Sequence, residues 1–315
     1  MPSRRIALSA SVLAAAGLVG SSVTQQAFAA PADGSNPAAG KFVAGQTSVR
    51  TVVVNGVQRS YRVHMPAGYT RGIPTPLVLA FHARSQSAVE FEHVTGLTRL
   101  PAITVFPDGL RSAAGPQSWQ GAPYANPRAD DIGFTRAILS QVGAEASVDR
   151  GRVFLIGRSN GGSLTNLLTC RMPGRFRAMA LISSAFYPQA EAGCGGTRPV
   201  STIVFHGTAD PIVPYLGAVK FGNQLQPVPA YLNQQARRAG CQKPVTRSAG
   251  GNVTRIDWPL CRSGAMITHL RFNGGGHGWP HPTYASLIEP GQRVNTSSLI
   301  WQFFQARAVT SSFGS

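Results

Sequence analysis

The sequence predicts a single α/β domain with a doubly wound, mostly parallel sheet that begins with a β-hairpin. Three observations support this fold class. Short apolar runs without polar alternation recur along the chain, as is typical of strands that are covered on both faces. Segments with helical spacing separate these runs, which is the order expected of consecutive β-α units. These β-α units follow one predicted β-hairpin, and the sequence between them contains neither an internal repeat nor an interdomain linker.

The hairpin is predicted from RTVVVNGVQRSYRVHMP, in which two β-rich runs flank Asn55 and Gly56. Asn-Gly is typical of the tight turn that joins two antiparallel strands. The buried strands of the parallel sheet are then predicted from the apolar runs that follow. These runs are residues 76–82, 103–108, 152–157, 178–185, 201–207 and 265–272.

Helices are predicted between these strands from apolar spacing and from the residues at their ends. DDIGFTRAILSQV carries its acids in the first turn, and VPAYLNQQARRAG ends in glycine. NGGSLTNLLTCRM directly follows the run 152–157. SSLIWQFFQAR, near the C-terminus, begins with serines and ends with arginine. Together these elements predict one domain that spans residues 48–310.

Residues 1–29 have the three parts of a secretory signal peptide. MPSRR is basic, IALSASVLAAAGLVG is apolar, and Ala27 and Ala29 occupy the small positions of a cleavage site. The apolar part is too short for a comfortable membrane span, so we expect an exported protein without integral membrane association. Both general secretion and, from SRRIAL, the twin-arginine route fit this segment. Residues 30–47, rich in Ala, Gly, Pro and Ser, predict an unstructured lead-in.

The chain is strongly basic, with 29 Lys and Arg residues against 12 Asp and Glu residues. The lysines are only Lys41, Lys220 and Lys243, and apart from the pairs Arg4-Arg5 and Arg237-Arg238 the arginines are spread singly along the chain. Nucleic-acid binders more often carry clustered basic runs with interleaved aromatic residues. The pattern therefore argues against a nucleic-acid partner and is consistent with adhesion to an anionic cell wall or polymer.

The four cysteines, Cys170, Cys194, Cys241 and Cys261, form an even set without a Cys-x-x-Cys pair. In an exported protein this pattern favours two disulfides over a metal site. Three pairings are open, and four buried thiols are the alternative to all of them. The sequential pairing closes two short loops, each contributing about 3 kcal/mol in the chain-entropy model.

Ser159 is the predicted nucleophile. It lies in GRSNGG, between the predicted strand that ends at residue 157 and a predicted helix. This is the position of a nucleophile elbow, a strained turn that needs little side-chain volume around it. Gly157, Gly161 and Gly162 meet that need. Because the chain contains 35 glycines, the pattern G-x-S-x-G alone is weak, and the flanking strand and helix carry the prediction.

A nucleophilic serine needs a base and an orienting acid, and in this arrangement the acid precedes the histidine along the chain. Few acidic residues follow the serine, so each of them can be considered in turn as the orienting acid. Asp210 comes directly after the strand 201–207, where a carboxylate reaches the C-terminal edge of the sheet. Glu191 lies in a loop, Asp257 lies in a β-segment, and Glu289 follows the candidate histidines. Asp210 is therefore the predicted acid.

His277 is the predicted base. It stands in NGGGHGWP, a glycine-rich loop directly after the last predicted strand, from which it can lean over the serine. His269 lies inside that strand and is expected to be a packed residue. His281 is a weaker alternative because prolines flank it. The same prolines prevent the helix that would align His277 and His281 on a metal, so neither a metal nor another cofactor is predicted.

The oxyanion hole is predicted from two backbone N–H groups, each contributing about 3 to 4 kcal/mol to transition-state stabilisation. One belongs to Asn160, the residue after the nucleophile. The other comes from the loop FHARSQSA after an early strand. Arg84 N–H is the first candidate there, and Ala83 N–H is the second.

In combination these motifs resemble the secreted polyhydroxybutyrate depolymerases and feruloyl esterase-like enzymes of the α/β-hydrolase superfamily. The resemblance extends from about residue 50 to residue 308 and implies the α/β-hydrolase fold, the same triad and the sequential cysteine pairing. One departure is His82-Ala83, where the family usually has His-Gly. Alanine adopts a glycine-only backbone angle only at a cost, so a left-handed residue 83 would strain this loop. The matching stretches are RVFLIGRSNGGSLTNLLTCRMPGRF, HGTADPIVPY, GGGHGWP and SLIWQFF, with PDG, SWQG and DDIGF between them.

We therefore expect an exported serine esterase that works through an acyl-enzyme without a cofactor. The expected substrate is a hydroxyalkanoate polyester or a feruloyl or acetyl ester of plant polysaccharide. Two alternatives stay open. One is an exported, mycolyltransferase-like acyltransferase on the same fold, which would pass the acyl group to a sugar. The other is a non-catalytic relative that binds polymer or cell wall.

Overall fold

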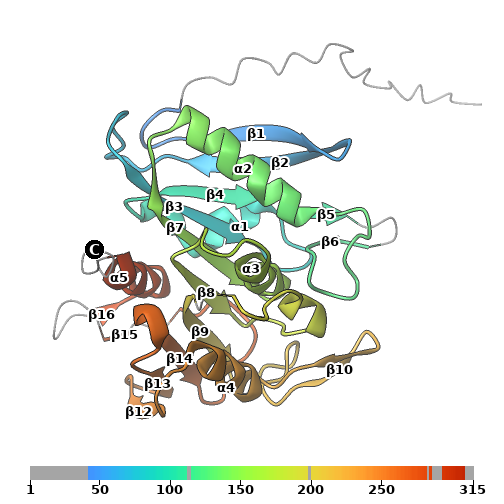
Figure 1. Ribbon diagram of the computed structural model, residues 1–315, viewed down its shortest axis with the longest axis vertical. Helices are drawn as coiled ribbons and strands as arrows, with labels where there is room; N and C mark the ends of the chain where they lie inside the picture. Colours follow the sequence, from blue (N-terminus) through green and yellow to red (C-terminus); the bar gives the residue numbers. More distant parts are fainter. Residues whose placement is uncertain (1–41, 112–114, 198–199, 282–283, 286–292, 309–315) are drawn as a thin grey trace, which may run out of the picture. The chain divides into compact units, whose positions relative to one another are not determined.

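A ten-stranded, mostly parallel sheet forms the centre of the fold (Figure 1). In spatial order its strands are β1 (Thr47–Val54), β2 (Val57–His64), β4 (Ile103–Pro107), β3 (Thr75–Phe81), β7 (Val148–Arg158), β8 (Ala178–Ile182), β9 (Ser201–Gly207), β14 (Ile267–Phe272), β13 (Val253–Trp258) and β12 (Val245–Ser248). Neighbouring strands from β4 to β14 pair in parallel. Antiparallel strands flank them on both sides. This is the predicted fold class, a mostly parallel sheet that begins with a hairpin.

The computed structural model describes residues 42–111, 115–197, 200–281, 284–285 and 293–308, which belong to one compact unit. The predicted signal peptide and residues 30–41 of the predicted lead-in lie outside these ranges. Residues 42–47 belong to the fold, which therefore starts before the predicted boundary at residue 48. The reason is local packing: the Arg50 guanidinium lies 4.6 Å from the Phe42 ring, and Gly45 N–H donates to the Met65 carbonyl at 3.0 Å.

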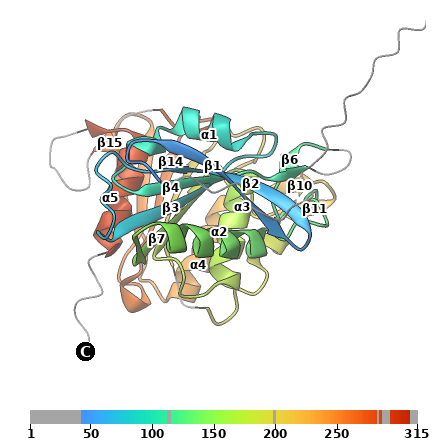
Figure 2. The same ribbon diagram turned by 90° about the horizontal axis from the view of Figure 1, so that it is seen from above.

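Helices cover both faces of the sheet (Figure 2). Side chains of α2, α3 and α4 share one buried cluster with Leu77, Leu79 and Phe81 of β3. Side chains of α1 and α5 share a second cluster with Val78 and Ala80 of the same strand. Alternate residues of β3 thus enter opposite core layers, which explains its continuous apolar run. The helices are α1 (Ala88–Thr95), α2 (Asp131–Glu145), α3 (Asn160–Arg171), α4 (Val228–Ala239) and α5 (Thr296–Ala308).

Strands β1 and β2 form the predicted hairpin. Val54 pairs with Val57 across Asn55 and Gly56, whose φ angles are 50° and 76°. Positive φ at both positions is the type I′ turn that matches the twist of the flanking strands.

Shorter elements occupy the connections: η1 (Leu97–Arg99), β5 (Leu110–Arg111), β6 (Gln117–Ser118), η2 (Pro188–Glu191), β10 (Ala218–Lys220), β11 (Asn223–Leu225), η3 (Arg262–Gly264), β15 (Tyr284–Ala285) and β16 (Arg293–Val294). Within the described ranges, no helix combines the length and apolar character needed to cross a membrane.

Candidate active site

The three side chains predicted to form the triad meet at the C-terminal edge of the parallel strands. Ser159 directly follows β7, Asp210 follows β9, and His277 lies in the loop after β14. The carboxyl ends of parallel strands share one edge, so residues far apart in the sequence become neighbours there. Ser159 and His277 line one cavity of about 420 Å³, called the serine cavity below. Asp210 is hydrogen-bonded to His277.

Ser159 occupies a strained turn between β7 and α3. Its φ and ψ are 53° and −117°, a conformation that costs an ordinary residue about 1 to 3 kcal/mol. The turn leaves no room for side chains beside it. A Cβ on Gly161 would collide with the carbonyl oxygens of Phe81 and His82, and a Cβ on Gly157 would collide with Thr165. Close approach of β7, α3 and the end of β3 therefore requires both glycines, as the sequence predicts.

The Asp210 carboxylate is fully engaged. Its Oδ1 accepts hydrogen bonds from the N–H groups of Ile212 at 2.9 Å and Val213 at 2.8 Å. Its Oδ2 accepts one from His277 Nδ1 at 2.8 Å. Burial raises the pKa of this carboxyl, but the hydrogen bonds from His206, His277 and Val213 outweigh burial and hold the pKa well below its usual range. Asp210 is thus ionised and fixed in orientation.

His277 is oriented by that hydrogen bond. Because Nδ1 donates to Asp210, Nε2 is the ring nitrogen left to take a proton. The two other histidines considered from the sequence lie elsewhere. His281 is exposed and lines only a larger neighbouring cavity. His269 is buried in β14, where Nδ1 donates to the Val204 carbonyl at 3.1 Å and Nε2 accepts from Tyr215 at 3.1 Å.

His206 is a residue of this site that the sequence analysis did not identify. It lies in β9 and is buried. Its Nε2 is 2.9 Å from the Val213 carbonyl and 3.3 Å from Oδ2 of Asp210. Both partners only accept, so Nε2 carries the proton. The sequence signal was HGTAD, in which a histidine at a strand end precedes the acid by four residues.

Within the described ranges, no cluster of His, Cys, Asp and Glu could hold a metal ion.

Asn160, the first predicted oxyanion donor, begins helix α3. Its backbone N–H is one of the first-turn donors that have no acceptor within a helix. Its buried side chain holds the neighbouring loop: Oδ1 accepts from Trp119 N–H at 2.8 Å, and Nδ2 donates to the Trp119 carbonyl at 3.2 Å. The Trp119 indole donates in turn to the His82 carbonyl at 2.9 Å. This network joins the turn at Ser159 to the loop after β3.

The loop after β3 lines the serine cavity with Ala83 and Arg84. His82 braces it, because Nδ1 donates to the Ala83 carbonyl at 2.7 Å and Nε2 accepts from Gly109 N–H at 2.9 Å. Ala83 N–H donates to Gln86 Oε1 at 3.2 Å, which leaves Arg84 N–H as the better oxyanion candidate. The residue with left-handed backbone is Ser85, at φ 68°, and not Ala83. Alanine therefore causes no backbone strain of this kind.

Aromatic side chains form one wall of the serine cavity. Tyr124, Tyr187 and Phe221 line it, and the ring centroids of Tyr124 and Phe221 are 4.7 Å apart. The Arg84 guanidinium lies 4.9 Å from the Tyr124 ring and 5.6 Å from the Phe221 ring. Arg158 and Lys220 add two further cations to the lining. An aromatic surface with adjacent positive charge can stack against a planar group.

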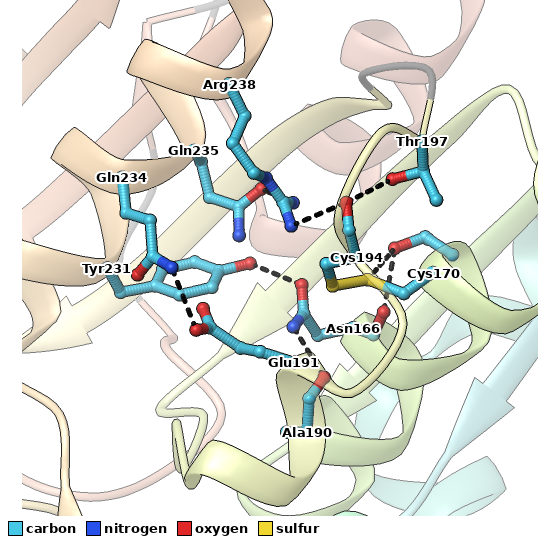
Figure 3. The surroundings of a disulfide bond; sticks show 11 residues. Asn166, Cys170, Ala190, Glu191, Cys194, Thr197, Tyr231, Gln234, Gln235 and Arg238 are labelled. Atoms are coloured by element: carbon cyan, nitrogen blue, oxygen red, sulfur yellow. Dashed lines mark hydrogen bonds between the residues drawn. A yellow bond between two sulfur atoms is a disulfide. The ribbon is translucent and has the colours of Figure 1, made fainter.

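Two disulfides support the elements behind the site. Cys170 is bonded to Cys194 and Cys241 to Cys261, which confirms the sequential pairing. Figure 3 shows the first bond, which ties α3 to the loop after η2. Asn166 of the same helix donates to the Ala190 carbonyl at 2.8 Å and accepts from Tyr231 of α4 at 2.8 Å. The helix that begins at the candidate nucleophile is thus anchored by a covalent bond and by buried hydrogen bonds.

Comparison with known proteins yields esterases. No family model matches the chain. Feruloyl esterase D of Neurospora crassa is 30% identical over 278 residues, covering 82% of this chain and 85% of the relative. Feruloyl esterase C of Emericella nidulans is 28% identical over 270 residues, covering 80% and 85%. The solved acetyl xylan esterase from Aspergillus awamori matches with a TM-score of 0.53 at 16% identity, covering 73% of this chain and 94% of that one. This last likeness shows the α/β-hydrolase fold.

Proposed function

The chain belongs to the feruloyl esterase-like family of α/β-hydrolase carboxylic esterases, and from that premise we propose that it is an exported serine esterase with Ser159, Asp210 and His277 as its triad. The observation that carries the triad is the 2.8 Å hydrogen bond from His277 Nδ1 to Asp210 Oδ2, beside a serine on a strained turn that shares the cavity with His277. Two disulfides support export, because such bonds persist in oxidising compartments.

In the proposed mechanism, His277 Nε2 removes the hydroxyl proton of Ser159 as its Oγ attacks the ester carbonyl carbon. The carbonyl oxygen becomes an oxyanion, which the N–H groups of Asn160 and Arg84 stabilise. Asp210 stabilises the imidazolium through its hydrogen bond. His277 then gives the proton to the leaving alcohol oxygen, and an acyl-serine remains. A water that loses its proton to His277 attacks the acyl carbon; the bond from that carbon to Ser159 Oγ then breaks, His277 returns the proton to Oγ, and the carboxylic acid leaves.

We propose a phenolic acyl ester of plant polysaccharide as the substrate. Tyr124, Tyr187 and Phe221 form a wall against which the ring of a feruloyl group could stack. An acetyl or a hydroxybutyryl group would leave this wall without a partner. Relatives that carry the name feruloyl esterase support the same choice.

A hydrolysis panel tests this function. The panel contains methyl ferulate, 4-nitrophenyl acetate, acetylated xylan and hydroxybutyrate oligomers, with labelling by a fluorophosphonate probe as an independent measure of the nucleophile. We expect labelling of the wild type but not of Ser159→Ala, and the highest kcat/KM on methyl ferulate. Faster release of hydroxybutyrate would assign the polyester instead. Transfer of the feruloyl group to a sugar in preference to water would identify an acyltransferase, and a chain without labelling or hydrolysis would be a binding protein.

A further inference from the structure

A second cavity of about 680 Å³, called the alcohol cavity below, lies beside the serine cavity. Both cavities are lined by Gln86, Arg158 and His277, so they adjoin at the His277 ring. In ester hydrolysis the base passes its proton to the departing alcohol oxygen. The alcohol part of a substrate therefore leaves on the His277 side, whereas the acyl part stays near Ser159 and the loop of Ala83 and Arg84. This geometry places the alcohol part in the larger cavity.

Arg158 is the charged side chain at the junction of the two cavities. Its Nε is buried and has no hydrogen-bond partner within the described ranges. Asp210 is near enough to act on its charge, but that carboxylate already accepts hydrogen bonds from His277, Ile212 and Val213. Burial lowers the pKa of the guanidinium and Asp210 opposes that shift. An arginine stays charged throughout the physiological range, so a cation whose buried Nε has no hydrogen-bond partner among the described residues lines both cavities.

The lining offers this cation no carboxylate. Neither cavity has an Asp or Glu among the described residues that line it. Gln86 accepts the Ala83 N–H through Oε1, which leaves its amide NH2 as a further donor beside Arg158. The other polar side chains that line the alcohol cavity are Ser183, Asn252, Trp279 and the histidines His206, His277 and His281. A partly buried guanidinium without an anion is unfavourable, and a ligand carboxylate would complete the pair.

We propose that Arg158 binds a carboxylate on the alcohol part of the substrate, as in esters of polysaccharides that contain uronic acid. This inference rests on the proposed function and adds a charge requirement to it. The planar guanidinium fork matches a carboxylate through two parallel hydrogen bonds. A phosphate or sulfate ester is the poorer match, because a single guanidinium meets it. The high positive charge of the chain favours approach of such an acidic polymer.

The test compares two esters whose leaving groups are nearly equal in size and differ in charge. They are the 4-carboxyphenyl and 4-carbamoylphenyl esters of the acyl group that the hydrolysis panel favours. We expect wild-type kcat/KM to be about tenfold higher for the carboxylate, and Arg158→Met to bring the ratio near one, mainly through KM. Arg158→Lys should retain part of the preference. Arg136→Met, which removes a charge from α2 outside both cavities, should retain all of it.

Three outcomes would overturn the carboxylate site. One is an equal wild-type kcat/KM for the two esters, which needs no variant and so decides the case even if Arg158→Met does not fold. Another is an equal fall for both esters in Arg158→Met, which would mean that Arg158 only supports the triad. The third is a wild type that cleaves neither ester and resists the fluorophosphonate probe. That result would reject the proposed function as well, whereas the first two would leave it standing.

Discussion

His206 Nε2 lies 3.3 Å from Oδ2 of Asp210, the same carboxylate oxygen that accepts the hydrogen bond from His277 Nδ1. The two imidazoles therefore approach one oxygen, while two backbone N–H groups hold the other. His206 is fixed in place because its Nε2 also donates to the Val213 carbonyl at 2.9 Å. We interpret His206 as a positioning residue, which acts on His277 through the carboxylate.

Replacing His206 tests that role. In His206→Leu the donor is lost, and the pKa of Asp210 should rise because one of the hydrogen bonds that lower it is gone. We expect kcat to fall about tenfold, with the acid limb of kcat/KM displaced to higher pH. In His206→Gln an amide N–H can replace Nε2, and most of both effects should be reversed. A Gln variant as impaired as the Leu variant, with an unchanged pH profile, would reduce His206 to a packing residue.

The proposed nucleophile and base can be separated from their neighbours by substitution. Ser159→Ala and His277→Ala should lower ester hydrolysis by on the order of 10⁴-fold or more. The comparison variant is His281→Ala, because His281 is the alternative base; it is exposed and lines the alcohol cavity, so we expect its loss to change KM and to leave kcat near the wild-type value. Circular dichroism should show the same fold in all three variants. If His281→Ala is the inactive variant and His277→Ala is not, the base is misassigned.

Ala83 provides a prediction about the loop after β3. Since the positive φ belongs to Ser85, Ala83→Gly relieves no strain and only adds freedom to the unfolded chain. We expect a loss of about 0.5 to 1 kcal/mol in unfolding free energy and unchanged turnover. The matched variant is Ser85→Gly, which should be neutral or stabilising because glycine adopts a φ of 68° without cost. A rise in kcat for Ala83→Gly would mean that alanine distorts the oxyanion donors.

The meeting of Ser159, Asp210 and His277 at one sheet edge could be predicted from the sequence because strand ends are visible in it and because acids are scarce after Ser159. The apolar runs of β7, β9 and β14 show where these strands end, and the carboxyl ends of parallel strands lie at one edge of the sheet. What could not be predicted depends on contacts between distant segments. The bonds of His82 to Gly109 and of Trp119 to His82 join loops whose approach only the folded chain defines. The same holds for the aromatic wall of Tyr124 and Phe221.

Two of the elements that were not predicted from the sequence, α1 and β12, were missed for local reasons. Helix α1 is short and has a weak apolar pattern, but Ser87 and Glu90 form a capping box at its start. This S-x-x-E signal was readable in SAVE. Strand β12 is exposed along its whole length and so carries no apolar run. It forms through its antiparallel pairing with β13 at the edge of the sheet.

The disulfides predict a measurable share of stability. Cys170 and Cys194 are 24 residues apart, and Cys241 and Cys261 are 20 apart. Removing either bond by paired alanine substitutions should lower the unfolding free energy by about 3 kcal/mol, as measured by chemical denaturation. Peptide mapping without reduction should recover both linked pairs. Free thiols in the oxidised protein, or a peptide that links Cys194 to Cys241, would contradict this pairing.

His269 should make the fold sensitive to acid. Burial is the largest effect on this residue and lowers its pKa from 6.5 to about 3. The unfolded chain therefore binds a proton between these values while the folded chain does not, so stability is lost as pH falls through this window. The expected loss is about 1.4 kcal/mol per pH unit between roughly pH 6 and pH 4.

The test measures unfolding free energies at pH 7.5 and pH 4.5 for the wild type and for His269→Asn. Asparagine retains an N–H donor for the Val204 carbonyl, the partner of His269 Nδ1, but it does not titrate. Other groups also lower the stability in acid: burial lowers the pKa of His82, and protonation of Asp210 reduces the unfolding free energy below about pH 4. Both groups are present in the two proteins, so the difference between the proteins reports on His269 alone. We expect the variant to be less stable at pH 7.5 yet to lose less between the two pH values. Equal losses would show that His269 is not the group whose protonation unfolds the chain, since the remaining titrating groups are common to both proteins.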